Sequence, residues 1–158
     1  MNESTTSRSR KSPTPDELGA WRGFIETSER IRSVIGSRLQ TDSGLSTGDY
    51  SVLLSLVESP NNRVRSSELA TRVGWERSRL SHHLGRMEQR GLIRREECLT
   101  DNRGAEACLT AAGADAFRRA SAPHLHAVQE LFVSALSPEQ LAAIADISRA
   151  LTSHLESQ

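Results

Sequence analysis

Apolar residues recur at intervals of three and four residues near both ends of the chain. In residues 18–39 this pattern covers about six helical turns, which predicts one long amphipathic helix that ends at residues 42–44. In residues 141–155 the same pattern predicts a C-terminal helix. The segment SPEQ at 137–140 is a typical helix start, with serine at the cap, proline at the first position and glutamine three residues after the cap.

Two more helices are predicted between these ends. Ser46 or Thr47 caps the first, which closes in a turn at residues 60–62. Its inward face is predicted to consist of Tyr50, Leu53, Leu54 and Val57. The second follows Thr110, and Pro123 inside it predicts a kink or break, because proline lacks an amide N–H and clashes with the preceding turn.

The centre of the chain predicts a short helix, a tight turn and a polar helix. Residues 66–73 form the short helix, and Gly74 follows where a left-handed residue ends a helix. The polar helix covers about residues 76–90 and stops at Gly91. Its apolar stripe, at i, i+4 and i+7, is limited to Leu80, Leu84 and Met87.

A β-hairpin is predicted directly after the polar helix. Residues 92–97 form its first arm, the turn chemistry of residues 100–104 forms its tip, and residues 105–109 form its second arm. The second arm has two alanines and a glutamate, so its position supports the hairpin more than its β-propensity does. These elements predict a mainly α fold with a small β-hairpin.

Composition bounds the class of protein. No uncharged run approaches the ~18 residues of a membrane span, and the N-terminus has no apolar signal region. Residues 1–15 hold no apolar residue after Met1 and are expected to be a disordered tail. Two cysteines, Cys98 and Cys108, cannot form a disulfide scaffold, so a cytoplasmic protein is expected.

The charges balance over the whole chain but are sorted along it. Twenty basic residues face twenty acidic ones, which taken whole argues against a nucleic-acid partner. Residues 63–103, however, carry ten basic and six acidic residues, a net charge of +4, while residues 16–62 and 104–158 carry −3 each. The predicted polar helix therefore lies in a basic segment between two acidic ones.

This arrangement predicts a winged helix-turn-helix, whose second helix enters the DNA major groove while the hairpin contacts the backbone or minor groove. Arginine bonds guanine edges, and serine and histidine reach bases or phosphates. Asp101 is expected to hold the guanidinium of Arg103 at the hairpin tip. A merely solvated charged helix is the alternative, but this helix lacks the alternating acidic and basic pattern of such helices. The candidate DNA-binding residues are Ser67, Arg77, Ser78, Arg79, Ser81, His82, Arg86, Arg94 and Arg103.

The same segment resembles the MarR (multiple antibiotic resistance regulator) family of transcription factors, over roughly residues 18–155. The shared motifs are SSELA at 66–70, SRLSHHLGRME at 78–88, GLIRR at 91–95, DNRG at 101–104 and LTAAG at 109–113. Two positions depart from the family pattern. His82 stands where many relatives have arginine or another polar residue, and Pro123 interrupts a helix that is usually continuous.

The resemblance implies a homodimeric regulator, most simply a repressor, that binds double-stranded DNA at a pseudo-palindromic operator. It places Arg103 in the minor groove and Arg79, Ser81 and His82 at base edges. It also divides the chain into a helical dimerisation region (16–45 and 114–158) and a winged helix-turn-helix domain (46–113).

Effector binding, redox regulation and metal binding each compete with a simpler interpretation of the residues concerned. Many family members bind a small aromatic acid as effector, in a cleft between the dimer helices and the winged domain. Trp21, Arg22 and Tyr50 could line such a cleft, although core roles for Trp21 and Tyr50 are favoured. A regulatory disulfide between Cys98 and Cys108 is disfavoured against two ordinary small residues. Zinc is disfavoured because the histidines and cysteines lack ligand spacing, so no cofactor or metal is expected.

No enzyme motif is present: the sequence has no phosphate-binding glycine loop, no GxSxG and no nucleophile–base pair. The competing hypothesis is a dimeric helical module whose basic face binds an acidic protein rather than DNA.

Overall fold

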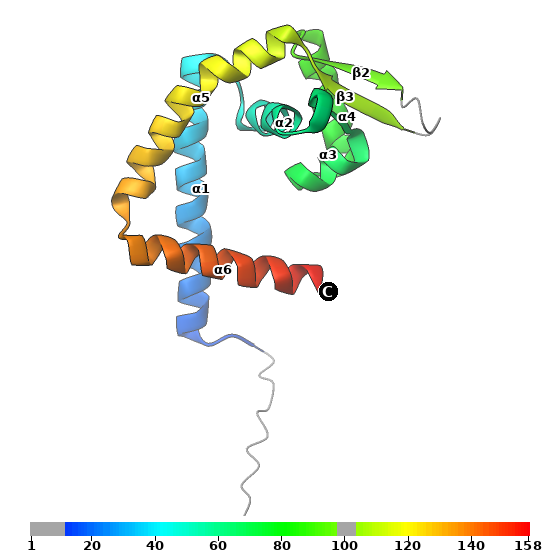
Figure 1. Cartoon of the computed structure of the whole chain (residues 1–158). Helices are drawn as coiled ribbons and strands as arrows, with labels where there is room; N and C mark the ends of the chain where they lie inside the picture. Colours follow the sequence, from blue (N-terminus) through cyan, green and yellow to red (C-terminus); the bar gives the residue numbers. More distant parts are fainter. Residues whose placement is uncertain (1–11, 98–103) are drawn as a thin grey trace, which may run out of the picture. The chain divides into compact units, whose positions relative to one another are not determined.

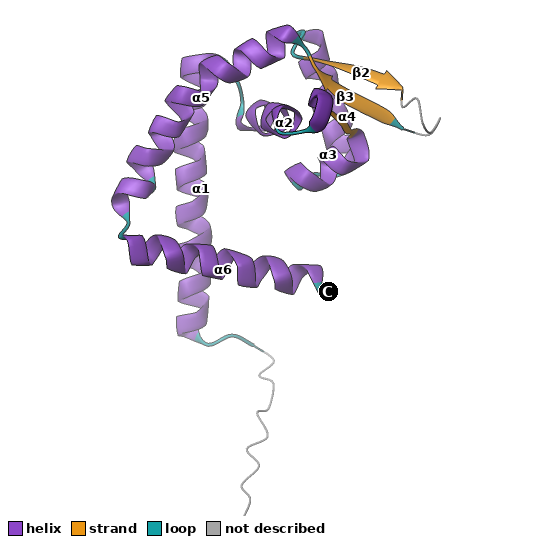
Figure 2. Cartoon of the chain, in the orientation of Figure 1, coloured by secondary structure: helices purple, strands orange, loops and turns teal. Residues whose placement is uncertain are grey.

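The computed structural model describes residues 12–97 and 104–158 (Figures 1 and 2). The chain divides into two compact units, residues up to Val34 and residues Ile35–Gln158. The described helices are α1 (Pro15–Ser43), α2 (Thr47–Val57), α3 (Ser66–Val73), α4 (Arg77–Gln89), α5 (Ala111–Leu131) and α6 (Pro138–Glu156). The strands are β1 (Arg63–Arg65), β2 (Ile93–Glu97) and β3 (Ala105–Leu109), and the short 3-10 segments are η1 (Pro60–Asn62) and η2 (Val133–Ala135). No described helix is both long and apolar enough to cross a membrane.

The first unit is the N-terminal part of α1. Thr14 and Glu17 cap this helix reciprocally: the hydroxyl of Thr14 accepts from the Glu17 amide at 3.3 Å, and the Glu17 carboxylate accepts from the Thr14 amide at 2.6 Å. The long predicted helix is confirmed, and it begins at Pro15, the last residue of the expected tail. Its large apolar side chains Leu18, Trp21 and Phe24 are exposed.

The second unit is built on a core beneath α2, α3 and α4. Ser46 caps α2 in a capping box with Asp49, as one of the two predicted caps. The inward face of α2 is only partly as predicted, because Val57 is exposed while Val52 and Leu56 are fully buried. Since α3, α5 and β3 all pack on α2, its buried surface is wider than a single stripe. The largest fully buried side chains are Leu45, Val52, Leu53, Leu56, Leu69, Leu80, Leu84, Met87 and Ile93.

The predicted hairpin is present, and a third strand joins it. Strand β3 lies between β1 and β2 and pairs antiparallel with both. Ala107, which is fully buried, is opposite Val64 in one pair and opposite Arg95 in the other. Strand β1 precedes α3 directly, so the sheet ties the first turn of α3 to the hairpin.

Helix α5 is continuous through Pro123, so the predicted break is wrong (Figure 1). The carbonyl that loses its amide donor belongs to Arg119, which is exposed, so water can hydrate it. Ala120 and Ala127 are buried on either side of the proline and hold both halves of the helix in place. Helix α6 starts with the predicted capping box of Ser137 and Gln140, and none of its residues is buried.

Candidate nucleic-acid interface

Helix α4 separates an anchoring face from a solvent face. Leu80, Leu84 and Met87 are almost completely buried, as their spacing predicts. The preceding turn depends on Gly74, whose φ of 69° lies in the left-handed region that suits glycine at a helix end. All the predicted DNA-binding residues of this helix are exposed. We call them the outer face: Arg77, Ser78, Arg79, Ser81, His82 and Arg86.

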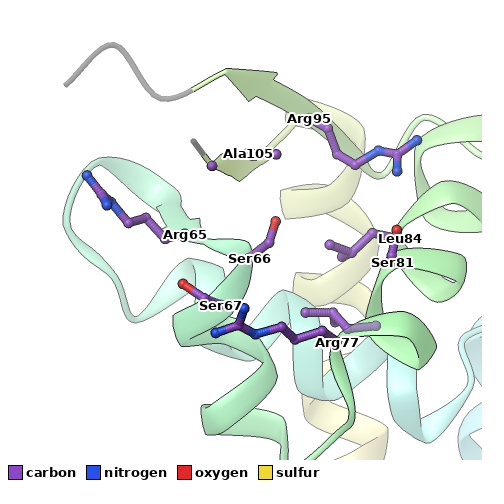
Figure 3. Close-up of a pocket in the computed structure, with 10 residues that line it drawn as sticks. Arg65, Ser66, Ser67, Arg77, Ser81, Leu84, Arg95 and Ala105 are labelled. Carbon is purple, nitrogen blue, oxygen red and sulfur yellow. The ribbon is translucent and has the colours of Figure 1, made fainter. Parts of the chain in front are cut away.

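A cleft of about 450 Å³ lies between the first turns of α3 and α4 and the hairpin (Figure 3). Figure 3 shows arginines from three elements around it, Arg65 at the end of β1, Arg77 on α4 and Arg95 on β2. Hydroxyl groups complete its polar lining, from Ser66, Ser67 and Ser81. Guanidinium and hydroxyl groups are the donors that DNA-binding proteins direct at phosphate oxygens.

The two neighbouring arginines of β2 have different surroundings. Arg94 donates to Glu96 at 2.7 and 3.0 Å, and this hydrogen bond and the charge of Glu96 raise its pKa. Arg95 lines the cleft and donates to Glu88 at 2.9 Å. Hydrogen bonds from the amide and side chain of Arg95 lower the pKa of Glu88. Arg94 was predicted to contact DNA, whereas Arg95, and also Arg65, line the cleft.

Asp49 fastens α4 to α2 from behind the outer face. Its carboxylate accepts from the Ser46 amide at 2.9 Å and from Arg90 at 2.8 Å, and its other oxygen lies 3.0 Å from Nε2 of His83. Burial alone would raise its pKa, but the contacts with His83, Arg90 and Ser46 outweigh burial and hold the pKa well below the usual range. A buried, ionised carboxylate therefore joins the start of α2 to α4 and to Arg90 just beyond its end.

Several predicted site residues fall elsewhere. Asp101, Arg103 and Cys98 lie outside the described residues. Tyr50 is buried, with its ring 5.1 Å from Phe117 and 4.2 Å from His124, which supports the core interpretation. Trp21 and Arg22 belong to the first unit, where both are exposed. The core role favoured for Trp21 is therefore wrong for the single chain, because the described part of this unit has no buried residues for it to pack among and its side chain is 62% exposed.

The remaining cysteine and the metal question can be addressed within residues 12–97 and 104–158. Cys108 is buried in β3, and burial raises the pKa of its thiol, which disfavours the reactive thiolate. In this part of the chain, no group of three or more His, Cys, Asp or Glu side chains is arranged to hold a metal ion.

The fold and interface together define the class. A short helix, a tight turn and a polar second helix, followed by an antiparallel hairpin, constitute a winged helix-turn-helix. A family model described as the MarR family matches residues 43–104. AbsC from Streptomyces coelicolor, a MarR family transcriptional regulator, is 36% identical, with a TM-score of 0.87 over 94% of this chain and 100% of AbsC. The chain therefore belongs to the MarR family of transcriptional regulators.

Two further solved structures are similar. Sco3205 from Streptomyces coelicolor, a MarR family regulator in complex with DNA, is 37% identical, with a TM-score of 0.87 over 91% of this chain and 94% of its own. A mutant MarR from E. coli, complexed with operator DNA, shares the fold at 18% identity, with a TM-score of 0.77 over 89% of this chain and 99% of its own. Comparison with curated protein sequences gives no match.

Proposed function

We propose that this chain is a homodimeric transcriptional repressor that binds a pseudo-palindromic operator in double-stranded DNA. In this proposal each α4 enters a major groove with its outer face toward the bases, and the two copies lie ~34–36 Å apart. The cleft of Arg65, Arg77 and Arg95 contacts the phosphate backbone, and Arg103 enters the minor groove. Binding across a promoter blocks transcription.

The observation that carries the proposal is the outer face of α4. Six polar residues, three of them arginines, are exposed on one side of a helix whose other side is anchored in the core. A major groove admits one helix, so it needs a thin anchoring stripe and a broad polar face. The 37% identical relative Sco3205 was solved in complex with DNA, which supports DNA as the partner of this chain.

Dimerisation is supported by apolar side chains that a single chain leaves exposed. Phe24 on α1 is 52% exposed, Leu125 on α5 is 62% exposed and Leu155 on α6 is 72% exposed. Exposed large apolar groups on several helices are typical of a subunit interface.

The test is selection of duplexes from a random-sequence DNA pool, followed by titration of the selected duplex and of a random duplex. We expect a two-fold symmetric consensus and a clear preference for it. Arg79→Ala should weaken binding to the selected duplex by about 1–3 kcal/mol if Arg79 bonds a guanine. An equal loss on random DNA would show that Arg79 contacts only phosphate.

One control and one further variant sharpen this test. Arg118→Ala removes an exposed arginine of α5, paired with Asp115, and should leave DNA binding unchanged. Arg103→Ala should reduce affinity, and unchanged affinity would refute the assignment of the wing. Failure to select any duplex would favour the competing hypothesis, a basic face that binds an acidic protein.

An effector is the last part of the proposal. The organohalide sensor RdhR-CbdbA1625, at 19% identity, was solved in a 2,4-dichlorophenol bound form. We expect a small aromatic acid to raise the Kd for the selected duplex, with benzoate as the first probe.

A further inference from the structure

Trp75 lies in the turn between α3 and α4 and supports an arginine of the outer face. The guanidinium carbon of Arg79 lies 4.5 Å from the centroid of the Trp75 ring, within cation–π distance. The Trp75 ring is half-buried, so it is held by the protein on one side and covered by Arg79 on another. An arginine stacked in this way is restrained before any ligand binds.

His83 plays the same part for a second arginine. Its Nδ1 lies 3.0 Å from Nη2 of Arg86, and because arginine can only donate, Nδ1 is the acceptor. The ring is edge-on to Trp75, with centroids 4.9 Å apart and an interplanar angle of 73°. The His83 side chain is only 12% exposed and lies against Asp49 on its inner side.

Both rings rest on the first turn of α2, at Gly48. A Cβ placed on Gly48 would lie 2.6 Å from Cη2 of Trp75 and 3.0 Å from Cε1 of His83. A side chain at this position would therefore have to displace one or both rings. Gly48 is buried, so the close approach belongs to the packed interior of the domain.

We propose that Trp75 and His83 form a positioning layer between α2 and the outer face of α4, which presets the guanidinium groups of Arg79 and Arg86 for base recognition. This inference rests on the proposed function. A free arginine loses much rotamer freedom when it binds a base edge, whereas a preset arginine has already lost part of it. The layer thus adds to sequence preference without itself bonding a base.

The test compares Trp75→Leu, Trp75→Phe, Arg79→Ala and the double variant Trp75→Leu/Arg79→Ala. Each variant is titrated with the duplex that the wild-type protein selects from a random pool, with its single-base-pair variants and with a random duplex. We expect Trp75→Leu to weaken binding to the selected duplex by roughly 3- to 30-fold and to leave the random duplex within about twofold. Trp75→Phe, which keeps an aromatic face, should retain most of the affinity.

The decisive readout is which base pair loses its preference. Trp75→Leu should relax the same base pair that Arg79→Ala relaxes, and the double variant should bind no more weakly than Arg79→Ala alone. Independent losses, or equal losses on selected and random duplexes, would overturn the proposal, because Trp75 would then act on the fold or on phosphate.

A second variant tests the contact between the positioning layer and α2. Gly48→Ala should relax base preference as the ring variants do, while Ser51→Ala, at an exposed position one turn along α2, should not. Unchanged base preference in Gly48→Ala would contradict the role of α2. If the wild-type protein selects no consensus, the proposed function itself fails. If it selects a consensus and Trp75→Leu keeps the same base preference, only the positioning layer is refuted.

Discussion

Replacement of Asp49 by alanine removes the carboxylate that joins α2 to α4. The side chain is only 4% exposed. Its carboxylate accepts hydrogen bonds from the Ser46 amide and from Arg90, and it lies 3.0 Å from Nε2 of His83. Three kinds of stabilisation are lost together: a capping interaction, a charged hydrogen bond and a contact to a largely buried histidine.

The expected loss in the free energy of unfolding follows from these contacts. Loss of a helix cap costs ~0.5–2 kcal/mol. A hydrogen bond to a charged group contributes ~1.5–3 kcal/mol, but Arg90 is 44% exposed, so water can hydrate it after the change and the lower end applies. Arg90 also keeps its 3.0 Å hydrogen bond to the Gly44 carbonyl. We therefore expect Asp49→Ala to lower the free energy of unfolding by about 2–4 kcal/mol.

The assay is urea denaturation followed by far-ultraviolet circular dichroism, at one fixed protein concentration because subunit association adds to stability. Asp115→Ala is the matched control, since that carboxylate is 50% exposed in a surface pair with Arg118 and should contribute about 0.5 kcal/mol or less. A loss for Asp49→Ala no larger than that of the control would refute the role assigned to Asp49.

The pH dependence gives the same test an internal check. The pKa of Asp49 is lowered in the folded protein, so its ionised form stabilises the fold fully above the unfolded value of ~4. This contribution is lost as the pH falls below ~4 toward the lower pKa of the folded state. The stability difference between wild type and Asp49→Ala should be constant from pH 5 to 7 and shrink below ~4. A difference that stays constant down to pH ~3 would show that the charge of Asp49 contributes nothing.

Three further predictions concern packing, association and salt. Gly113→Ala should lower the free energy of unfolding by ~2–4 kcal/mol, because its Cβ would overlap the Leu92 carbonyl. Gly85→Ala on α4 has room for a Cβ and should raise the free energy of unfolding by up to about 1 kcal/mol. Equal effects of the two variants in urea denaturation would contradict this packing argument. Leu151→Glu should shift the light-scattering mass from dimer toward monomer, since Leu151 is 48% exposed in the single chain; an unchanged dimer mass would remove α6 from the interface. The Kd for the selected duplex should rise by about 10³–10⁵ between 50 and 200 mM salt if six to ten phosphates are contacted, and a Kd that stays within threefold would exclude extensive phosphate contacts.

Features fixed by local chemistry could be predicted from the sequence. Leu80, Leu84 and Met87 mark the buried side of α4 by spacing alone, and Gly74 ends α3 because few other residues adopt a positive φ. Strand β1 was not predicted, since it has three residues of which only Val64 is buried, and it exists only through its pairing with β3. A strand defined by distant partners leaves little local pattern.

The candidate site likewise has residues that could be predicted from the sequence and residues that could not. The outer face of α4 could be predicted because it follows from the same periodicity as the buried stripe. Arg95 was missed in favour of Arg94, because alternate residues of a strand face opposite sides and the register of the hairpin decides which side meets the cleft. Asp49 was missed because its partners His83 and Arg90 are distant in sequence and meet it only in the folded domain.

The central position of β3 in the sheet has a consequence for synthesis on the ribosome. Strand β1 emerges before the helix-turn-helix, yet Arg63 pairs with Cys108, near the end of β3. Chains are made from the N-terminus and domains fold as units, so a nascent chain that stops before β3 holds both helices of the motif but no sheet. Translation must proceed past Leu109 before the DNA-binding domain can fold, and α5 and α6 are made only after that point.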